Sequence, residues 1–256
     1  MIAAGVVIAV LIASSVGSAP EGRTNPAARQ KPAAPAQLPS VEQILDRYVK
    51  ALGGKAALEK INSISARGTF SAVEAGQTGT VETYKKGPDK SVSIVEVNGY
   101  GTILQGFDGK IGWSEDPQSG VRELSGVELA QTKRDSDIRK DLHIKQQYAK
   151  IDVTGTAKVG DLDTYVVEAA PPEGGLEKLY FDKETGLLDR VDMVLKSPLG
   201  EAPVQNYLED YREVDGVKFA FRQRQVAGGL TYIATFTDVK DNVPIDDAKF
   251  SKPASQ

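Results

Sequence analysis

The sequence contains no cysteine, one histidine and one tryptophan among its 256 residues. The absence of cysteine excludes disulfide bonds and a lipid-modified cysteine on the chain itself. With no cysteine and no second histidine to share a metal ion, a transition-metal site is not expected, and no cofactor is predicted. His143 lies in a segment of helical character, and we expect it to be a solvated helix residue rather than a pH switch or a ligand.

Concentrated charge is also missing. The chain has 31 lysine and arginine residues against 35 aspartate and glutamate residues, a net charge of −4. Basic residues form only short runs such as Lys85-Lys86 and Lys133-Arg134. Because phosphate binding needs a concentrated basic face, nucleic acid is not an expected partner. The hydrophobic content of 40% and the charged content of 26% are typical of a globular protein with a sizeable core.

The one long hydrophobic run lies at the start of the chain. Residues 1–19 are apolar and then small, and they end in Val16-Gly-Ser-Ala19. This pattern is typical of a secretory signal peptide, and an uncleaved membrane anchor is the alternative. In both cases the rest of the chain is expected outside the cytoplasm. Residues 20–39 are rich in proline and alanine, which predicts an extended, disordered tether.

A helix is predicted directly after the tether. Ser40 and Gln43 have the spacing of a capping box. The apolar residues that follow recur at helical spacing and form one stripe: Val41, Ile44, Leu45, Tyr48, Val49 and Leu52. Gly53-Gly54 is expected to end the helix as a left-handed C-cap, and residues 55–61 to form a second short helix. Such a stripe must pack on an apolar surface, which a sheet face provides.

From residue 65 the hydrophobic period changes to two, which predicts strands separated by turns rich in Gly, Asn, Asp and Pro. The predicted strands are 65–73, 78–86, 91–97, 100–107, 110–115, 121–124, 149–153, 155–159, 164–170, 176–182, 187–196, 204–214, 217–226 and 230–239. This set is expected to be an overcount, because strand boundaries are hard to predict. Asp108-Gly109 is expected to be a two-residue hairpin turn, and Gly186 to adopt a positive φ. The simplest packing is one antiparallel sheet curled into a barrel or half-barrel, with helices against one face.

Residues 125–148 interrupt the strand pattern. Ser125 and Glu128 have capping-box spacing, and Ile138 and Leu142 lie one helical turn apart. Residues 132–137, in contrast, are all polar. We therefore expect an interrupted helical segment that moves relative to the sheet.

Candidates for catalysis are few. Asp161 with Asp163, and Glu115 with Asp116, are paired carboxylates, but their surroundings have the composition of hairpin turns. A hydrolase that uses either pair is the least favoured hypothesis. No Gly-x-Ser-x-Gly motif is present. We therefore predict no catalytic residues and do not expect an enzyme.

Apolar residues share one face of three strands near the end of the chain. They are Val191, Met193 and Leu195, then Val217, Phe219 and Phe221, then Leu230, Tyr232, Ala234 and Phe236. This face is either an ordinary closed core covered by the helices or the wall of a hollow. Large curved sheets can enclose more space than their own side chains fill and then hold an apolar ligand. The pattern alone leaves both alternatives open.

The order of several short motifs resembles that of the LolA/LolB-like family of periplasmic lipoprotein carriers. A strand from residue 79 leads into a basic turn at Pro88, and the hairpin Asp108-Gly-Lys-Ile-Gly-Trp113 is followed by Asp116-Pro117. Residues 179–186 are similar to the family's strand and turn, and residues 243–250 to its closing segment before a proline. The likeness spans about residues 40–253. Where the carriers commonly have an arginine before the turn proline, this chain has Gly87, preceded by Lys86.

The resemblance implies a mainly β domain at residues 40–253, in which a curved antiparallel sheet forms an unclosed half-barrel with helices packed against its concave face. It implies a monomeric periplasmic carrier whose apolar hollow receives the acyl chains of lipoproteins or other lipids, with a membrane-bound donor or acceptor protein. The predicted ligand-binding residues are Tyr84, Ile94, Leu104, Trp113, Met193, Phe219, Phe221 and Phe236. The alternative is a periplasmic protein-interaction or sensory domain of the same fold, such as a regulator that contacts an anti-sigma factor.

Overall fold

The computed structural model describes residues 38–197 and 200–254. The predicted signal or anchor at residues 1–19 and most of the predicted tether lie outside the described residues. In the part that is described, thirteen strands form one antiparallel sheet that does not close on itself. Strands account for 54% of the structure, so the predicted mainly β, unclosed half-barrel is confirmed.

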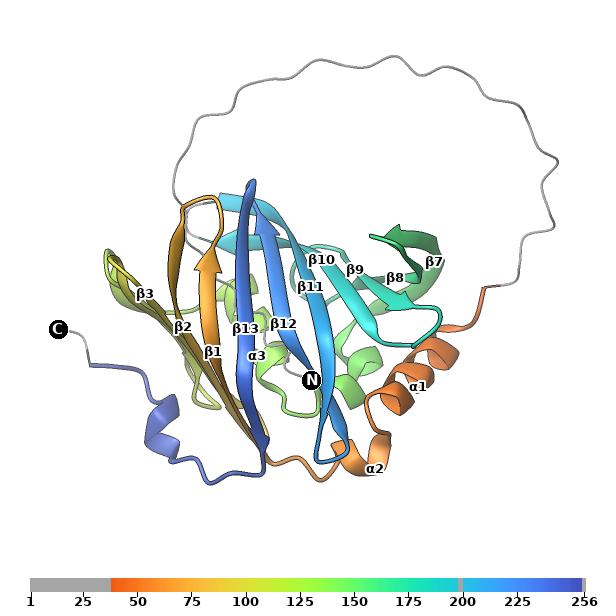
Figure 1. Cartoon of the computed structure of the whole chain (residues 1–256), viewed down its shortest axis with the longest axis horizontal. Helices are drawn as coiled ribbons and strands as arrows, with labels where there is room; N and C mark the ends of the chain where they lie inside the picture. Colours follow the sequence, from red (N-terminus) through yellow and green to blue (C-terminus); the bar gives the residue numbers. More distant parts are fainter. Residues whose placement is uncertain (1–37, 198–199, 255–256) are drawn as a thin grey trace, which may run out of the picture.

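The chain builds this sheet in two halves. The strands of the first half run outward to one edge: β1 (Ser63–Ala72), β2 (Gln77–Lys86), β3 (Lys90–Val97), β4 (Gly101–Phe107), β5 (Gly112–Asp116) and β6 (Gly120–Glu123). The strands of the second half run back from the opposite edge: β7 (Lys150–Val159), β8 (Leu162–Ala170), β9 (Glu177–Asp182), β10 (Leu188–Ser197), β11 (Gly200–Val214), β12 (Val217–Ala227) and β13 (Leu230–Asp241). β1 pairs with β13, and this central seam joins the two halves (Figure 1).

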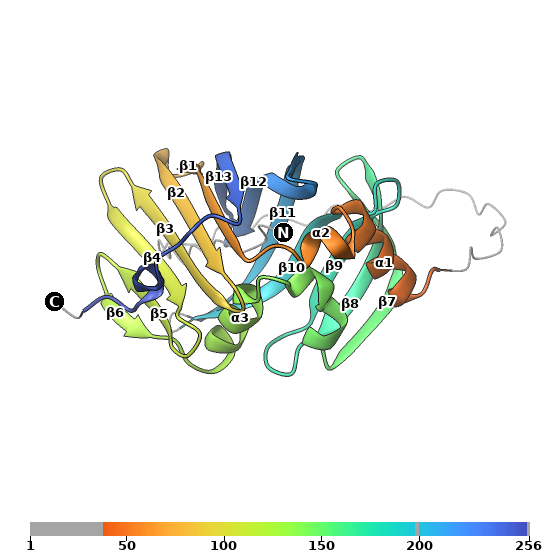
Figure 2. The ribbon, with the colours of Figure 1, turned by 90° about the horizontal axis from the view of Figure 1, so that it is seen from below.

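The helices occupy three places in the chain. α1 (Val41–Ala51) and α2 (Lys55–Leu58) precede the sheet. α3 (Gly126–Ser136) and the 3-10 helices η1 (Lys140–Leu142) and η2 (Ile144–Gln147) lie between β6 and β7, and η3 (Asp247–Phe250) follows β13. In Figure 2, α1 and α2 lie beside the second half of the curved sheet, and η3 lies near β3 to β5.

The predicted capping box of α1 is confirmed. Gln43 N–H donates to Ser40 Oγ at 3.2 Å, and Ser40 N–H donates to Gln43 Oε1 at 2.9 Å. The apolar stripe is buried against the sheet, where the Tyr48 ring meets the edge of Phe181 on β9 with 5.3 Å between centroids. Burying side chains of this size stabilises a fold by about 1.5–3 kcal/mol each.

The turn after α1 fits tightly against the hairpin between β11 and β12. Gly53 and Gly54 have φ angles of 128° and 86°, as the predicted left-handed cap requires. A Cβ atom on Gly53 would lie only 2.1 Å from the carbonyl oxygen of Gly216. Lys218 N–H also donates to the carbonyl of Leu52 at 2.8 Å. Because only glycine permits this approach, Gly53 determines how closely α1 sits on the sheet.

The prediction of separate strands at 149–153 and 155–159 is wrong. These residues form the single strand β7, which pairs with β8 along its length. The register shifts between Val153 and Gly155, which is the mark of a β-bulge. The bulge explains why the pattern of alternation breaks within one strand.

The predicted two-residue turn at Asp108-Gly109 is also wrong. β4 ends at residue 107 and β5 begins at residue 112, so the loop comprises residues 108–111. Asp108 Oδ1 accepts hydrogen bonds from the N–H groups of Lys110 and Ile111, each at 2.7 Å. The aspartate side chain therefore organises a longer loop than the one that an Asp-Gly pair suggests.

We expect Gly53→Ala to lower the free energy of unfolding by roughly 3 kcal/mol or more, because the new Cβ would collide with backbone atoms of the β11–β12 hairpin. Gly54→Ala is the matched control. Gly54 also has a positive φ, but a Cβ there would meet no atom within 4 Å, so the loss should be about 1–2 kcal/mol. Urea unfolding measures both values, and equal losses would contradict the steric role of Gly53.

Candidate functional site

The connection between β6 and β7 crosses the concave face of the sheet; we call residues 124–149 the crossing segment. It consists of α3, η1 and η2, so the predicted interrupted helical segment is confirmed. The predicted capping box at its start is wrong, because the Ser125 side chain makes no capping hydrogen bond. Glu128 instead pairs with Arg122 of β6 through two hydrogen bonds of 2.6 and 2.8 Å.

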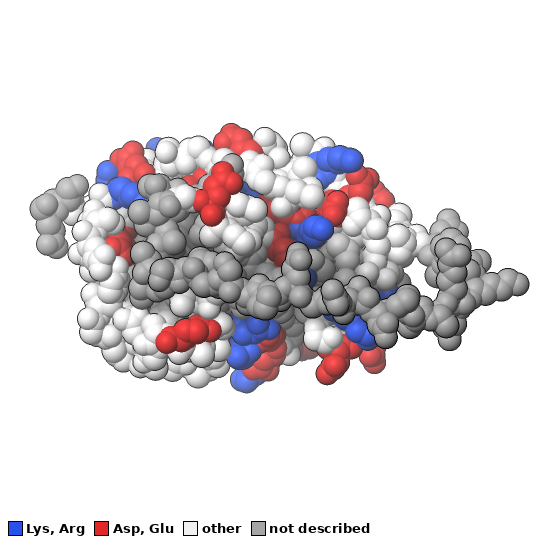
Figure 3. Space-filling model, turned by 90° about the horizontal axis from the view of Figure 1, so that it is seen from above, with Lys and Arg blue, Asp and Glu red and all other residues white. Residues whose placement is uncertain are grey.

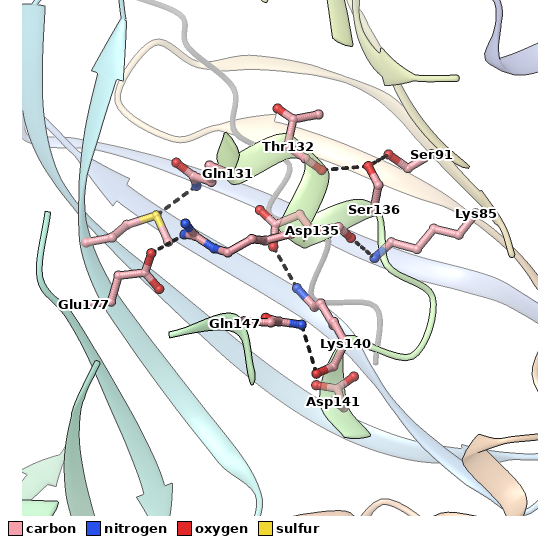
Figure 4. A network of polar contacts seen from close by, with 12 residues as sticks. Lys85, Ser91, Gln131, Thr132, Asp135, Ser136, Lys140, Asp141, Gln147 and Glu177 are labelled. Carbon is pink, nitrogen blue, oxygen red and sulfur yellow. Dashed lines mark hydrogen bonds and ion pairs between the residues drawn. The ribbon is translucent and has the colours of Figure 1, made fainter. Parts of the chain in front are cut away.

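Polar contacts hold the crossing segment to the first half of the sheet. Three of them come from β2, β3 and β4, and they join Lys85 Nζ to Asp135 O, Ser91 Oγ to Ser136 Oγ (2.6 Å) and Gln105 Nε2 to Thr132 Oγ1 (3.0 Å). Figure 4 shows the first two among the polar contacts of this region. Residues of the polar run 132–137 thus form hydrogen bonds to the sheet.

Further polar contacts hold it to the second half. Arg134 forms an ion pair with Glu177 of β9, and Tyr148 Oη donates to the same carboxylate at 2.6 Å. Gln131 Nε2 donates to Met193 Sδ of β10 at 3.2 Å (Figure 4). Burial raises the pKa of Glu177, and the Arg134 guanidinium opposes this rise. The crossing segment therefore bridges both halves through hydrogen bonds and ion pairs, and its Ile138 and Ile144 are buried in the main core cluster.

Lys85 is buried among these polar side chains, with 1% of its surface exposed. Burial lowers its pKa to about 7, and the positive charge of Lys140 adds to this effect. Both the ammonium and the neutral amine can donate the hydrogen bond to Asp135 O. The charge of Lys85 is therefore the costly part of this contact, whereas its hydrogen bond is retained in either form.

A cavity of about 100 Å³ lies between the crossing segment and the concave face of the second half. Apolar side chains of β9 to β13 form one part of its wall: Leu179, Leu188, Val191, Met193, Leu208, Tyr232 and Ala234. Carboxamide side chains form another part: Gln131, Gln147, Asn206, Gln223 and Gln225. Charged side chains complete the wall: Arg134, Asp135, Lys140, Asp141, Glu177 and Arg224. The site therefore combines apolar, neutral hydrogen-bonding and charged groups.

The predicted ligand residues of the second half divide between this cavity and the core. Met193 lines the cavity. Phe219, Phe221 and Phe236 belong instead to the main core cluster, together with the buried side chains of α1 and α2. The two alternatives that the sequence left open, a closed core and a hollow, thus occur next to one another on the same strands.

The predicted ligand residues of the first half face away from the cavity. They are Tyr84, Ile94, Leu104 and Trp113. On the same strands, the residues of opposite parity contact the crossing segment: Lys85, Ser91, Gln105 and Gly112. Because side chains alternate along a strand, the predicted residues pack on the other face, where Trp113 Nε1 donates to the carbonyl of Phe250 at 2.9 Å. The expectation that these four side chains contact a ligand in the hollow does not fit their position.

The basic residue that reaches the crossing segment is Lys85 and not Lys86. Lys86 Nζ donates to the carbonyl of Ile245 at 2.8 Å and pairs with Asp247 at 2.7 Å. It therefore fastens the C-terminal segment to the outer face. A shift of one residue in a strand exchanges the two faces, so a motif alone does not decide which lysine points inward.

One member of each carboxylate pair has a structural partner. Asp161 lies in the turn between β7 and β8, and Asp163 forms an ion pair with Lys158 at 3.2 Å. Asp116 Oδ1 accepts a hydrogen bond of 2.8 Å from the N–H of Gln118, in the turn after β5. These contacts are typical of turns and surface hairpins.

His143 lies at the surface, and its Nδ1 is 3.1 Å from Asp137 Oδ2. Within residues 38–197 and 200–254, no group of three or more His, Cys, Asp or Glu side chains could hold a metal ion. Over the same residues, no helix combines the length and the apolar character needed to cross a bilayer.

Comparison with solved structures identifies the fold. A LolA superfamily protein from Nitrosomonas europaea has a TM-score of 0.55 and 14% identity, over 84% of this chain and 99% of that chain. The chain has the LolA fold. A DUF1329 family protein from Desulfovibrio piger has a TM-score of 0.56 and 18% identity, over 82% of this chain and 97% of the other.

A third LolA-fold match is a domain from Vibrio parahaemolyticus that is named for outer membrane lipoprotein sorting. Its TM-score is 0.53 and its identity 13%, over 82% of this chain and 96% of that chain. No protein-family model and no curated protein matches the sequence. The shared feature is therefore the LolA fold itself, which three-dimensional comparison detects at these low identities.

Sequence reasoning missed the amide residues of the cavity. A signal for two of them was present, because the inward face of β12 continues from Phe219 and Phe221 to Gln223 and Gln225. Both glutamines are buried, with 9% and 6% exposed, and buried polar side chains usually have a specific partner. Gln131 gave no such signal, because its position depends on the path of the crossing segment.

We expect Lys85→Met to remove a pH dependence of stability. The pKa of Lys85 is about 7 in the folded state against an ordinary value of 10.5. Between these values the unfolded chain binds more protons, so the contribution of Lys85 makes the wild type more stable as the pH rises. Relative to Lys85→Met, the wild-type free energy of unfolding should increase from pH 7 to pH 9 by up to about 1.4 kcal/mol per pH unit.

The matched control for that experiment is Lys86→Met, which removes the neighbouring charge on the outer face. This variant should keep the wild-type slope between pH 7 and pH 9. Urea unfolding at a series of pH values gives all three curves. Parallel curves for the wild type and Lys85→Met would show that Lys85 is charged throughout this range in the folded protein.

Proposed function

We propose that the protein is an exported, non-enzymatic carrier that holds acyl chains in the cavity beneath the crossing segment. The observation that carries the proposal is the cavity, which has a wall of apolar side chains and a helical cover. Ligand sites of this kind bury apolar surface and use a few polar groups for orientation. Each buried CH₂ contributes about 0.8 kcal/mol, so burial of part of an acyl chain is already useful.

The expected cargo is the acyl portion of lipoproteins or of other lipids. Similarity in fold to a LolA superfamily protein and to a lipoprotein-sorting domain supports this class. The apolar run at residues 1–19 supports export to the periplasm, with a tether to the inner membrane if the run is retained. A monomeric carrier of this kind requires a membrane-bound protein to load or unload it. Figure 3 shows acidic and basic side chains interspersed on the visible part of one face.

In this proposal α3 acts as the lid of the cavity, while Ile138 and Ile144, later in the crossing segment, stay buried in the main core cluster. The buried side chains of α3 are polar: Gln131, Thr132 and Ser136. Lifting α3 therefore exposes little apolar surface and exchanges protein hydrogen bonds for bonds to water. Each such exchange has a net cost of about 1 kcal/mol. A lid held in this way opens at a lower cost than a helix held by an apolar stripe such as that of α1.

The alternative function is a protein-interaction or sensory domain of the same fold. In that case the cavity is a by-product of sheet curvature, and the protein takes up no lipid. Native mass spectrometry of protein purified from its export compartment, combined with lipid extraction, separates the two functions. A mass without lipid, together with failure to bind added lipid, would favour the interaction domain.

We expect Ala234→Trp to weaken lipid uptake at least about tenfold, because the indole would fill the cavity that Ala234 lines. Native mass spectrometry after incubation with a dipalmitoylated cysteine peptide gives the bound fraction. Ile233→Trp is the matched control, since it places the same side chain on the neighbouring residue and the opposite face. The control should bind as the wild type does. Equal uptake by folded Ala234→Trp would place the acyl site elsewhere.

We expect the double variant Ser91→Cys/Ser136→Cys to lock the lid when oxidised. The two hydroxyl oxygens are 2.6 Å apart, and the chain contains no cysteine that could compete. The disulfide would join α3 to β3 and slow both uptake and release of the dipalmitoylated peptide. Reduction with dithiothreitol should restore the wild-type rates in the same sample. Equal rates before and after reduction would show that α3 does not separate from β3 during uptake and release.

A further inference from the structure

The inward face of β12 changes its chemistry part-way along the strand. Phe219 and Phe221 belong to the closed core, whereas Gln223 and Gln225 line the cavity. Gln225 lies directly opposite Asn206 of β11 in the register of the sheet. Its Nε2 donates to Asn206 Oδ1 at 2.9 Å. We call Asn206 and Gln225 the amide pair.

One atom of the amide pair is without a hydrogen-bond partner in the part of the chain that the structure describes. This atom is Gln225 Oε1, on a side chain that is 6% exposed. Buried polar groups in proteins are almost always hydrogen-bonded, so an unbonded one on a cavity wall indicates a partner from outside the chain. If both amides are turned over, the unbonded atom becomes an N–H group. A hydroxyl satisfies either arrangement, because it both donates and accepts.

The charged side chains that line the cavity have partners within the chain. Arg224 pairs with Glu209 at 2.9 Å, and Asp141 accepts a hydrogen bond from Tyr48 Oη at 2.8 Å. Arg134 is paired with Glu177, and Lys140 with Asp135 at 2.9 Å. The amide pair itself is neutral. Burying an additional charge without a counter-charge costs far more than burying a hydroxyl that is hydrogen-bonded. The cavity is therefore suited to an uncharged polar group.

Apolar side chains flank the amide pair on the same row of the sheet. Val191 lies opposite Asn206 in the register, and Tyr232 lies opposite Gln225. Both line the cavity, as does Met193 one step along β10. A molecule whose polar group reaches the amide pair would thus lay its hydrocarbon on these side chains.

We propose that the amide pair binds a hydroxyl or amide group of an otherwise apolar, uncharged lipid, whose polar group then lies inside the cavity. The preferred cargo is therefore a neutral acylated molecule and not a bare hydrocarbon chain. This inference rests on the proposed function and specifies its ligand class. An ordered water is the other source of the same hydrogen bond, and the experiment separates the two.

The test compares two lipids of equal chain length, 1-monopalmitoylglycerol and methyl palmitate, by displacement of an uncharged fluorescent probe, a pyrene-labelled fatty-acid methyl ester. The double variant Asn206→Leu/Gln225→Met removes both amides and replaces them with apolar side chains of similar size. For each protein we divide the dissociation constant of methyl palmitate by that of monopalmitoylglycerol. We expect this ratio to be about tenfold larger in the wild type than in the variant. Comparing ratios cancels the different solubilities of the two lipids.

Gln205→Met is the matched control, since it makes the same change on the neighbouring residue of β11 and the opposite face. It should keep the wild-type ratio. Gln225→Met alone, measured in the same way, serves if the double variant does not fold. Equal ratios in wild type and variant would overturn the inference, because a water then satisfies the amide pair, and would leave the proposed carrier function in place. Failure of both lipids to displace the probe from the wild type would overturn the two together.

Discussion

A single connection joins the two edges of this sheet, and its path decides where the cavity and its cover lie. Because β6 and β7 are the opposite edges of a thirteen-stranded sheet, the residues between them must travel across its full width. They do so on the concave side, so the same constraint that joins the halves also encloses a space. Polar contacts to both halves hold this connection in place. Ile138 and Ile144 also anchor it in the main core, so within this connection α3 is the part whose buried side chains are all polar.

The extent of the closed core depends on where α1 sits. The contact of Gly53 with the β11–β12 hairpin seats α1 and α2 over one end of the concave face. There the aromatic residues of β12 meet helix side chains and leave no space for a ligand. Further along the same strand no helix stripe covers the sheet, and Gln223 and Gln225 face the cavity. One strand therefore serves both stability and binding, and its residue types change at the boundary.

Most of the fold could be predicted because it depends on local patterns. The period of two marks the strands, and the Ser40–Gln43 pair marks the start of α1. The bulge near Gly155 was missed because a glycine inside a strand indicates either a bulge or a break. The site was predicted less well. A motif locates a strand but not the face of its side chains, as Lys85 and Lys86 show, and the contribution of the crossing segment depends on contacts between distant residues.

The central seam determines when the sheet can be completed during synthesis and folding. β1 pairs with β13, and Ile64 lies opposite Asp241, so the sheet is completed by residues from the two ends of the domain. Pairings of such high contact order form late and slowly. During synthesis, β1 leaves the ribosome long before its partner exists. The seam thus stays unpaired until the last strand arrives, and until then β1 has one free edge that could pair with another strand.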